Sequence, residues 1–318
     1  MDYIVENLNQ MIENGEIAKL IELSERANNR EFETLMRMIG SRIVNNDAYC
    51  GLILLTGPSS SSKTTFSKRL SRAIGSQGVQ THVISLDNYY LDVETTKQNQ
   101  IARGEAPAEG EDYDYECLEA FDVELFKKQM NAFFHGETID VPYFDFTLHR
   151  PNGISDTIKR SGRDMIIVEG IQTMNPKLSS NLDFDFIFKI YLCPFDSYNY
   201  NGRDVIDSKA IRFLRRSYRD YKTRDASLAR TMEMWPNVRR GEERDIKPTK
   251  RYADYIFNSG HAYDVPFLAP KILELAKELS DEELARFNEI VNIETLKLFK
   301  PIDTLDLPSE SLFAEFNF

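Results

Sequence analysis

The chain has 318 residues, and its 39 Lys and Arg against 51 Asp and Glu give a formal net charge of −12 at pH 7. This balance argues against a protein that binds nucleic acid or a membrane surface, and no apolar run is long enough to span a bilayer. A hydrophobic content of 42% supplies a buried core and argues against a largely disordered chain. Three dispersed cysteines, Cys50, Cys117 and Cys193, argue against a disulfide framework and fit a reducing, cytoplasmic location.

Residues 1–46 have apolar side chains at helical spacing, for example Leu8 and Ile12, and predict a helical N-terminal lead of three short segments. Asn28 or Asn29 is suited to cap the third segment. We expect this lead to pack on the domain that follows. The alternative, a separate partner-binding bundle, is less favoured because the segments are short.

From residue 49 onward, apolar runs alternate with helical stretches. Residues 52–55 are apolar at every position, as in a strand buried on both faces of a parallel sheet. Runs of similar character are residues 82–86, 165–168, 186–192 and the shorter 255–257. Helical stretches between them are residues 64–74, 123–134 and 209–219. The alternation predicts an α/β fold with a doubly wound parallel sheet of about five strands and helices on both faces.

The most specific motif follows the first of these strands. It consists of Gly57, Pro58, Ser59, Ser60, Ser61, Ser62, Lys63, Thr64 and Thr65. These residues match the P-loop pattern G-x-x-x-x-G-K-[ST], except that Ser62 stands where glycine is usual. Backbone N–H groups of such a loop hold a polyphosphate, so all nine residues are predicted to bind ATP. Lys63 would reach the β- and γ-phosphates, and the Thr64 hydroxyl would ligate Mg²⁺. A serine-rich linker is the alternative, but it does not account for the flanking strand and helix.

The serine at position 62 poses a question of backbone conformation. If this position has a positive φ, a serine there is strained and nucleotide affinity could suffer. If φ is in the ordinary negative region, the serine costs little.

Two carboxylates directly follow predicted strands: Asp87 after residues 82–86 and Glu169 after residues 165–168. Ligands of an open parallel sheet bind beyond the carboxyl ends of its strands, so both acids should face the same crevice as Lys63. A P-loop kinase needs a carboxylate near its metal and a base for the acceptor hydroxyl. Either acid alone is equally well explained as a helix cap or turn residue. Two such acids beside a P-loop favour the interpretation that they take part in catalysis or metal binding.

Basic residues gather in one stretch of this acidic chain, namely Arg212, Arg215, Arg216, Arg219, Arg224 and Arg230. Arg212, Arg216 and Arg219 share one helix face. One interpretation is a solvated face paired with nearby acids. The other, favoured beside a P-loop, is a mobile lid over about residues 209–243 whose guanidinium groups close on a transferring phosphoryl group. We see little apolar patterning to hold this lid against the core.

In combination, these motifs resemble the uridine kinase and phosphoribulokinase family of P-loop kinases, and in particular its bacterial uridine kinase-like branch. The resemblance runs from residue 49 to about 266. It is carried by residues 57–65, 87–90, 114–122, 136–150, 168–171, 215–225 and 248–254. The chain departs from the family pattern at Ser62 and Asp225, which both stand at usual glycine positions.

The resemblance implies roles on the acceptor side of the site. Asp87 matches the catalytic base, and Glu116 matches the acid that holds the ribose hydroxyls, with Arg216 beside it. Phe144 and His149 match the aromatic residue and the histidine that contact the nucleobase. Tyr90 resembles a further part of that pocket wall.

On the nucleotide side, Lys63 and Arg219 are predicted to be catalytic and to carry transition-state charge. Arg224 is predicted to bind ATP, as part of the lid motif that the chain shares with the family. Thr64 and Glu169 are the predicted Mg²⁺ ligands. Mg²⁺, with ATP as phosphoryl donor, is the one cofactor expected.

We therefore expect a helical lead over residues 1–46, a P-loop kinase domain over 47–291 and a C-terminal docking tail over 292–318. The tail should dock because Leu312, Phe313 and Phe316 would otherwise be exposed.

The leading functional hypothesis is ATP-dependent phosphorylation of the 5′-hydroxyl of a pyrimidine nucleoside, uridine or cytidine. A kinase for another sugar hydroxyl, such as that of a phosphorylated pentose, would want extra basic residues, for which Arg150 and Lys159 are the only candidates. A nucleotide-binding regulatory protein without turnover is the third hypothesis, motivated by Ser62 and Asp225. The partners expected are ATP and a small nucleoside or sugar, and homo-oligomerisation stays open.

Overall fold

The computed structural model describes residues 2–43, 49–104 and 114–318. Its centre is a five-stranded sheet in which every neighbouring pair is parallel. In spatial order the strands are β10 (Tyr255–Asn258), β7 (Phe186–Cys193), β2 (Cys50–Thr56), β6 (Asp164–Glu169) and β3 (Gln80–Ser85). These are the five strands that the sequence predicts, so the predicted doubly wound α/β fold is confirmed.

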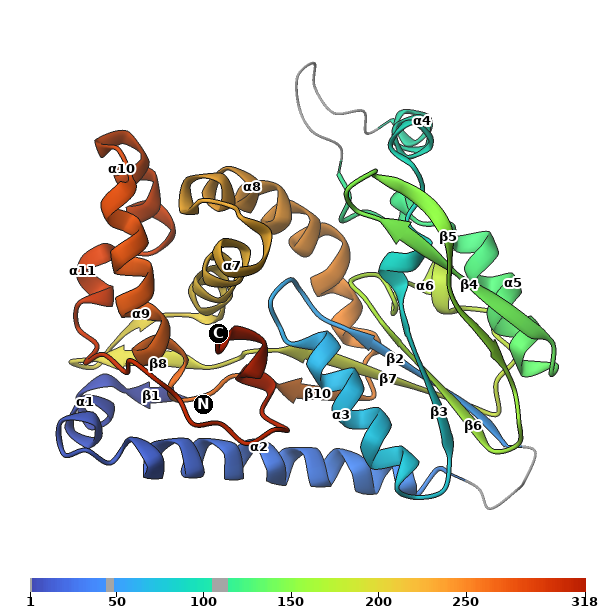
Figure 1. The fold of residues 1–318 in the computed structure, drawn as a ribbon, viewed down its shortest axis with the longest axis horizontal. Coiled ribbons are helices and arrows are strands. Elements are labelled where there is room, and N and C mark those ends of the chain that lie inside the picture. Colours follow the sequence, from blue (N-terminus) through green and yellow to red (C-terminus); the bar gives the residue numbers. More distant parts are fainter. Residues whose placement is uncertain (1, 44–48, 105–113) are drawn as a thin grey trace.

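The sheet is covered on both faces, as Figure 1 shows. Side chains of β2 alternate between the two faces: Leu52 and Leu54 belong to one buried cluster, and Ile53 and Leu55 belong to another. On the face of Ile53 and Leu55 lie α2 (Ile17–Gly40) and α3 (Lys63–Gly75). On the other face lie α5 (Val123–Phe134), the short α6 (Pro176–Ser179) and a hairpin of β4 (Thr138–Asp145) and β5 (Arg150–Lys159). The sequence analysis did not predict this hairpin.

The N-terminal segment forms β1 (Asp2–Ile4), α1 (Val5–Glu13) and the single long helix α2. The predicted helix cap at Asn28 or Asn29 is wrong, because both residues lie inside α2. The side chain of Asn28 is buried instead: its amide donates to the Asn258 carbonyl at 3.2 Å and its oxygen accepts from Arg69 at 3.0 Å. The expected boundary between residues 46 and 47 lies outside the described residues. The lead does pack on the rest of the chain, since β1 pairs with β8 (Ser197–Tyr200).

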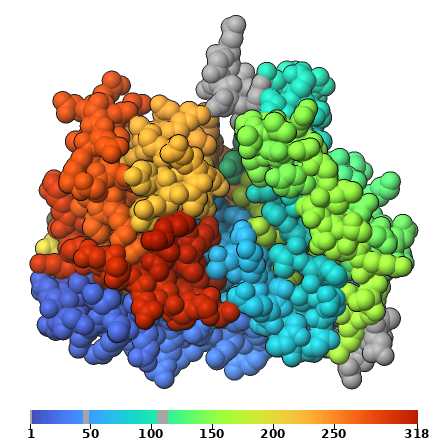
Figure 2. All heavy atoms as spheres, in the orientation of Figure 1, coloured from blue at the N-terminus to red at the C-terminus, as the bar shows by residue number. Residues whose placement is uncertain are grey.

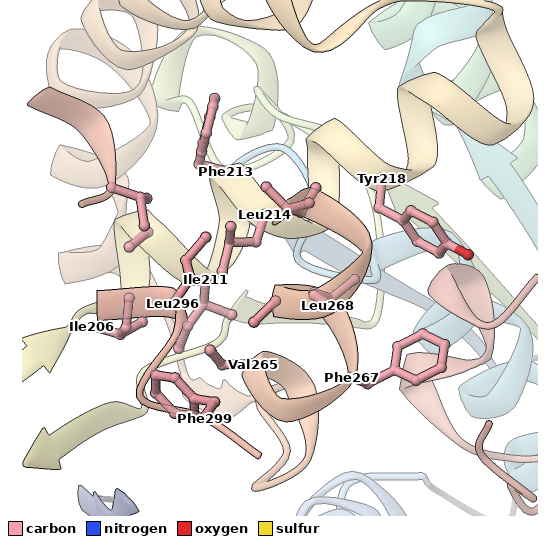
Figure 3. Close-up of a cluster of buried hydrophobic side chains, with 14 of the residues drawn as sticks. Ile206, Ile211, Phe213, Leu214, Tyr218, Val265, Phe267, Leu268, Leu296 and Phe299 are labelled. Carbon is pink, nitrogen blue, oxygen red and sulfur yellow. The ribbon is translucent and has the colours of Figure 1, made fainter. Parts of the chain in front are cut away.

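A second hydrophobic core lies beside the sheet and is built mostly from helices (Figure 3). Besides α1, α2 and residues near the C-terminus, it contains β8, β9 (Arg203–Ile206), α7 (Ser208–Arg224), α8 (Leu228–Gly241), α9 (Asp264–Leu275), α10 (Asp281–Ile290) and α11 (Ile293–Leu296). The expectation that the arginine-rich segment has little apolar packing is wrong for α7. Ile211, Phe213 and Leu214 are fully buried there, so α7 is a core helix. Whether the segment 209–243 moves stays a prediction.

The remaining elements connect these parts. They are α4 (Val93–Arg103) and the short helical turns η1 (Leu86–Tyr89), η2 (Leu118–Ala120), η3 (Glu242–Ile246), η4 (Lys247–Tyr252), η5 (Ala276–Glu278) and η6 (Leu312–Phe316). Among the described residues, no helix has the length and apolar character needed to cross a membrane.

Replacing Phe213 by alanine should test whether α7 is held by its apolar side chains. The ring is fully buried and packs near Trp235 and Phe287, with ring centroids 5.4 and 5.9 Å away. Because the change removes a buried ring and leaves a cavity, the free energy of unfolding in urea should fall by about 3–5 kcal/mol. The control Leu23→Ala, on the exposed side of α2, should change it by less than about 0.5 kcal/mol. Equal small effects would show that α7 is not anchored in this core.

Candidate active site

A cavity of ≈ 400 Å³ lies at the carboxyl ends of β2, β3 and β6, within the usual size range of small-molecule sites. In Figure 1 the β4–β5 hairpin stands on one side of the loop between β2 and α3, and α7 and α8 stand on the other. Predicted site residues that line it are Ser59, Ser60, Ser61, Ser62, Lys63, Thr64, Asp87, Tyr90, Glu116, Phe144, His149, Glu169, Arg216, Arg219 and Arg224. The predicted loop residues Gly57, Pro58 and Thr65 do not line it.

The loop between β2 and α3 is closely packed at its base. A Cβ added to Gly57 would lie 2.0 Å from the Leu192 carbonyl oxygen, so only glycine fits there. Ser60 and Ser62 both have positive φ, 62° and 68°. Lys63 donates from Nζ to the Pro58 carbonyl at 3.2 Å, which folds its side chain across the loop.

Position 62 therefore has the positive φ that the sequence analysis considered. Ser62 adopts the left-handed conformation, which costs a non-glycine residue free energy. Its Oγ atom is also buried without a hydrogen-bond partner in the described part of the chain. Asp225, at the other usual glycine position, is likewise left-handed, with φ 50°, and ends α7.

The two acids predicted from strand ends meet beside this loop. The Thr64 hydroxyl donates to Glu169 Oε1 at 3.2 Å. Burial, together with the nearby Asp87 carboxylate, raises the pKa of Glu169 to about 7, against the lowering effect of Lys63. Burial also raises the pKa of Asp87, against the lowering effects of Lys63 and Arg224. Both carboxyls thus take up protons more readily than usual when no cation is bound.

Three arginines of α7 contact the P-loop directly. Arg212 Nη1 donates to the Ser59 carbonyl at 3.4 Å, and Arg215 Nη1 donates to the Ser60 carbonyl at 3.5 Å. Arg216 Nη1 donates to the Ser59 hydroxyl at 2.8 Å. Because these three side chains are buried, the interpretation as a solvated basic face is wrong for them. It holds for Arg230, whose exposed side chain pairs with Glu233 at 3.1 Å.

Asp220 gathers the arginines at the mouth of the cavity. Its carboxylate lies 3.2 Å from Arg216 Nε, 3.6 Å from Arg219 Nε and 3.2 Å from Arg224 Nη1. One buried carboxylate therefore serves three cations, so these guanidinium groups keep N–H donors that can meet a polyanionic ligand beside the P-loop.

The acceptor side is organised around Glu116. Burial raises the pKa of this carboxyl to about 7, although Arg216 and Lys63 lower it. Its Oε2 atom is buried and has no hydrogen-bond partner among the described residues. The backbone around it is held firmly, since Asp114 Oδ1 accepts from the Glu116 N–H at 2.9 Å and Gln172 Nε2 donates to the Glu116 carbonyl at 2.5 Å. A fixed carboxylate with an unused oxygen is suited to accept hydrogen bonds from hydroxyl groups.

Aromatic residues form the wall opposite the P-loop. Tyr90 stacks on Phe121 with ring centroids 4.2 Å apart, and its hydroxyl donates to the Tyr115 carbonyl at 3.0 Å. Phe144 is buried, and its ring centroid lies 5.0 Å from that of Phe146, which is 58% exposed; both residues line the cavity. His149 lies in the exposed turn of the hairpin, with a positive φ of 51°.

Cavity-lining residues that the sequence analysis missed are Tyr115, Phe146, Ile171, Met234 and Glu315. The first three neighbour predicted residues in the sequence, and that proximity was the available signal. Met234 lies in α8, in the segment that the lid hypothesis covers. Glu315 had no local signal, because it is remote in sequence from every other lining residue.

Comparison with known proteins identifies the family of the chain. A family model described as "Phosphoribulokinase / Uridine kinase family" matches residues 52–266. The chain belongs to this family. It is therefore an ATP-dependent phosphotransferase that acts on a hydroxyl group, and the predicted resemblance is confirmed.

Bacterial uridine kinases are among the similar proteins. The chain is 33% identical to the uridine kinase of Borrelia duttonii over 211 residues, covering 66% of this chain and 86% of that one. It is 31% identical to the uridine kinase of Lactobacillus helveticus over 219 residues, covering 67% and 89%. A solved structure described as a possible uridine kinase from Bacillus stearothermophilus matches with a TM-score of 0.45 and 19% identity, covering 72% of this chain and 98% of that one.

Family kinases generally use Mg²⁺ with ATP, and the donor atoms here fit that ion. Thr64 offers a hydroxyl and Glu169 a carboxylate, both hard oxygen ligands, 3.2 Å apart. In the described part of the chain no group of three or more His, Cys, Asp or Glu could hold a metal by itself.

Replacing Ser62 by glycine should stabilise the protein. The change relieves the left-handed strain and removes a buried, unpartnered hydroxyl, while the added freedom of the unfolded chain partly offsets the gain. The free energy of unfolding in urea should rise by about 1 kcal/mol. The control Ala73→Gly, inside α3, should lower it by about 1 kcal/mol. Similar losses in both variants would show that Ser62 is not strained.

The stability of the Mg²⁺-free protein should depend on Glu169 in a defined pH window. The pKa of this carboxyl is about 7 in the folded protein against 4.5 in the reference state. Between these values the folded state holds a proton that the unfolded state releases. The stabilisation is therefore present below pH 4.5 and is lost as the pH rises through 7, by up to about 1.4 kcal/mol per pH unit.

Urea unfolding between pH 5 and pH 8 measures this effect. Glu169→Gln should flatten the slope, and Glu274→Gln, on the exposed surface of α9, should keep the slope of the unmodified protein. An unchanged slope in Glu169→Gln would contradict the raised pKa.

Proposed function

We propose that this kinase transfers the γ-phosphoryl group of ATP to the 5′-hydroxyl of a pyrimidine nucleoside. The observation that carries the proposal is that Asp87, Glu116 and the aromatic wall of the hairpin face the P-loop within one cavity. A nucleoside needs these three features together: a base for its hydroxyl, an acceptor for its ribose and an apolar surface for its ring. The uridine kinases of B. duttonii and L. helveticus support the same acceptor class.

The nucleotide would bind along residues 57–65, with its phosphates on the backbone N–H groups of the loop and the start of α3. Lys63 would leave its contact with the Pro58 carbonyl and reach the β- and γ-phosphates. Arg219 and Arg224 would stabilise the charge that develops on the transferring group. Thr64 and Glu169 would hold Mg²⁺, which when bound neutralises phosphate charge.

On the acceptor side, Asp87 would accept the proton of the 5′-hydroxyl as its oxygen attacks the γ-phosphorus and the bond to the β-phosphate oxygen breaks. Its raised pKa makes it a stronger base than an exposed aspartate, which suits this role. Glu116 would accept hydrogen bonds from the ribose 2′- and 3′-hydroxyls, using the oxygen that has no partner within the described residues. Arg216 would balance the charge of Glu116, which its effect on the carboxyl pKa supports.

The nucleobase would lie against Phe146, Tyr90 and the edge of Phe144, with His149 at its polar edge. A site that hydrogen-bonds a base edge rejects an analogue that leaves its polar groups unpaired. The pyrimidine preference rests on the resemblance of Tyr90, Phe144 and His149 to the base pocket of uridine kinases and on the uridine kinases among the relatives.

A phosphorylated pentose is less favoured as acceptor. It would need cations for its phosphate in addition to those that serve ATP. The sequence candidates for this purpose, Arg150 and Lys159, begin and end the ten-residue strand β5, are exposed, and do not line the cavity. A regulatory protein without turnover is not retained, because the family assignment indicates an enzyme. Cytoplasmic location and homo-oligomerisation stay predictions.

An ADP-release assay across acceptors tests the proposal. With Mg²⁺ and ATP, uridine and cytidine should each give at least about tenfold more ADP release than adenosine, guanosine or ribulose 5-phosphate, since an unsatisfied polar edge costs on the order of 1–3 kcal/mol. The variant Asp87→Asn, which keeps the side-chain volume, should lower kcat about a hundredfold or more while ATP still binds.

Calorimetric titration with a nonhydrolysable ATP analogue gives the matched measurement of nucleotide binding for Asp87→Asn. If neither uridine nor cytidine raises ADP release above the background hydrolysis of ATP measured without an acceptor, the assignment of the acceptor is overturned. A loss of less than about threefold in Asp87→Asn would assign the base to another group.

A further inference from the structure

One wall of the cavity comes from a segment outside the family match. Glu315 lines the cavity beside Arg219 and Arg224, yet it lies in η6, beyond the matched residues 52–266. Its Oε1 atom accepts a hydrogen bond from Arg219 Nη1 at 2.9 Å. Its Oε2 atom is buried and has no hydrogen-bond partner in the described ranges. A carboxylate from near residue 318 thus contacts an arginine that the proposed function places at the transferring phosphoryl group.

The segment that carries Glu315 is anchored on both sides of this residue. Leu312, Phe313 and Phe316 are fully buried, and η6 packs between α3 and α7. Figure 2 shows the same segment in dark red, filling the face between the light-blue and the gold helices. These three side chains therefore dock the C-terminal segment on the rest of the protein, as the sequence analysis expected.

Polar contacts add to this anchoring. The Ser311 hydroxyl donates to Glu25 Oε1 in α2 at 2.5 Å, and Arg72 in α3 donates to Glu310 at 2.8 Å. The Arg215 guanidinium carbon lies 5.0 Å from the centre of the Phe316 ring. Because contacts with α2, α3 and α7 hold η6, the backbone that carries the Glu315 side chain is fixed in position.

Arg219 needs such a support because its other partner is weak. The Asp220 carboxylate lies 3.6 Å from Arg219 Nε and is shared with two more arginines. Without Glu315, the long side chain of Arg219 could adopt many rotamers at the mouth of the cavity. With Glu315, the Nη1 end is fixed, and no described residue is hydrogen-bonded to Nη2.

We propose that Glu315 is a positioning residue of the phosphotransfer reaction: it holds the Arg219 guanidinium in the orientation in which its remaining N–H groups meet the charge of the transferring phosphoryl group. The proposal rests on the proposed function of Arg219. A donor that is fixed in advance stabilises developing charge without reorganisation, and displacement of such a donor by about 1 Å can cost up to a hundredfold in rate. The active site of this chain is then completed by a residue outside the segment that matches the family.

A competing role would be inhibition, in which the Glu315 carboxylate occupies Arg219 until a phosphate displaces it. The buried anchors of η6 favour positioning, because a carboxylate that must leave would be better placed on a loosely held segment. The two roles predict opposite changes in activity when the carboxylate is removed.

Steady-state kinetics of five variants test the proposal: Glu315→Ala, Glu315→Gln, Arg219→Ala, the double variant of Glu315→Ala with Arg219→Ala, and Glu310→Ala. We expect Glu315→Ala to lower kcat roughly ten- to a hundredfold, with KM for ATP changed less than about threefold. Arg219→Ala should lower kcat about a hundredfold or more. The double variant should equal Arg219→Ala, because Glu315 acts only through Arg219. Glu315→Gln, whose amide oxygen can still accept the hydrogen bond, should recover part of the rate.

Glu310→Ala is the matched control. Glu310 lies in the same segment and pairs with Arg72, but it is exposed and outside the cavity. The kcat of the Glu310→Ala variant should therefore equal that of the unmodified enzyme. Urea unfolding of each variant shows whether Glu315→Ala is destabilised more than Glu310→Ala. The Glu315→Gln variant keeps the test valid if the alanine variant unfolds.

The outcomes separate this proposal from the proposed function. A rise in kcat/KM for ATP in Glu315→Ala would replace positioning by inhibition. Losses that add in the double variant would mean that Glu315 acts through the fold. An inactive Arg219→Ala with a normal Glu315→Ala would overturn positioning alone, whereas a fully active Arg219→Ala would remove the proposed role of Arg219 and the positioning proposal with it.

Discussion

Arg212 and Arg215 place two positive charges in the interior of the protein, directly behind the P-loop. A buried guanidinium group must be paired and hydrogen-bonded, or it destabilises the fold by several kcal/mol. Glu242, at the end of α8, meets Arg212 at 2.6 Å, and Asp264, at the start of α9, meets Arg215 at 2.5 Å. The same guanidinium groups donate to the carbonyls of Ser59 and Ser60. One requirement, that of neutralising two buried charges, therefore fixes the positions of α8 and α9 relative to the phosphate-binding loop.

The acceptor side depends on this arrangement through α8. Gly241, its last residue, packs so closely on the segment before η2 that a Cβ there would lie 2.4 Å from Glu116 Cβ. One turn further on, Arg244 Nη2 donates to Asp114 Oδ2 at 2.5 Å. The helix that neutralises Arg212 thus also presses against the residue proposed to bind ribose. Nucleotide and acceptor sites share one support, and a displacement of α8 would be felt by both.

How much of this the sequence reveals depends on the range of the interactions. All five strands of the central sheet are readable, because a strand such as residues 52–55 shows its burial in its own apolar side chains. The P-loop and the acids Asp87 and Glu169 are readable because fixed spacing ties them to strand ends. The burial of α7 is not, because arginines look solvent-exposed until Glu242 and Asp264 are known to be near them. Asn28 resembled a helix cap for the same reason: its partners, Arg69 and Asn258, lie far along the chain. Glu315 is the extreme case, since only the folded chain brings it to Arg219.

The contact between Ser311 and Glu25 joins residues 286 positions apart, and the pairing of β1 with β8 joins Asp2 to Ser197. The entropy of closing a flexible loop grows only with the logarithm of its length, by about 0.6 kcal/mol per doubling. Such distant contacts therefore cost little equilibrium stability compared with shorter ones. They affect the rate of folding instead, because contacts between residues far apart in sequence slow the search for the native state. We expect the sheet with its P-loop to form early and the α2–η6 junction to form late, so that the wall containing Glu315 is among the last parts of the cavity to appear during folding.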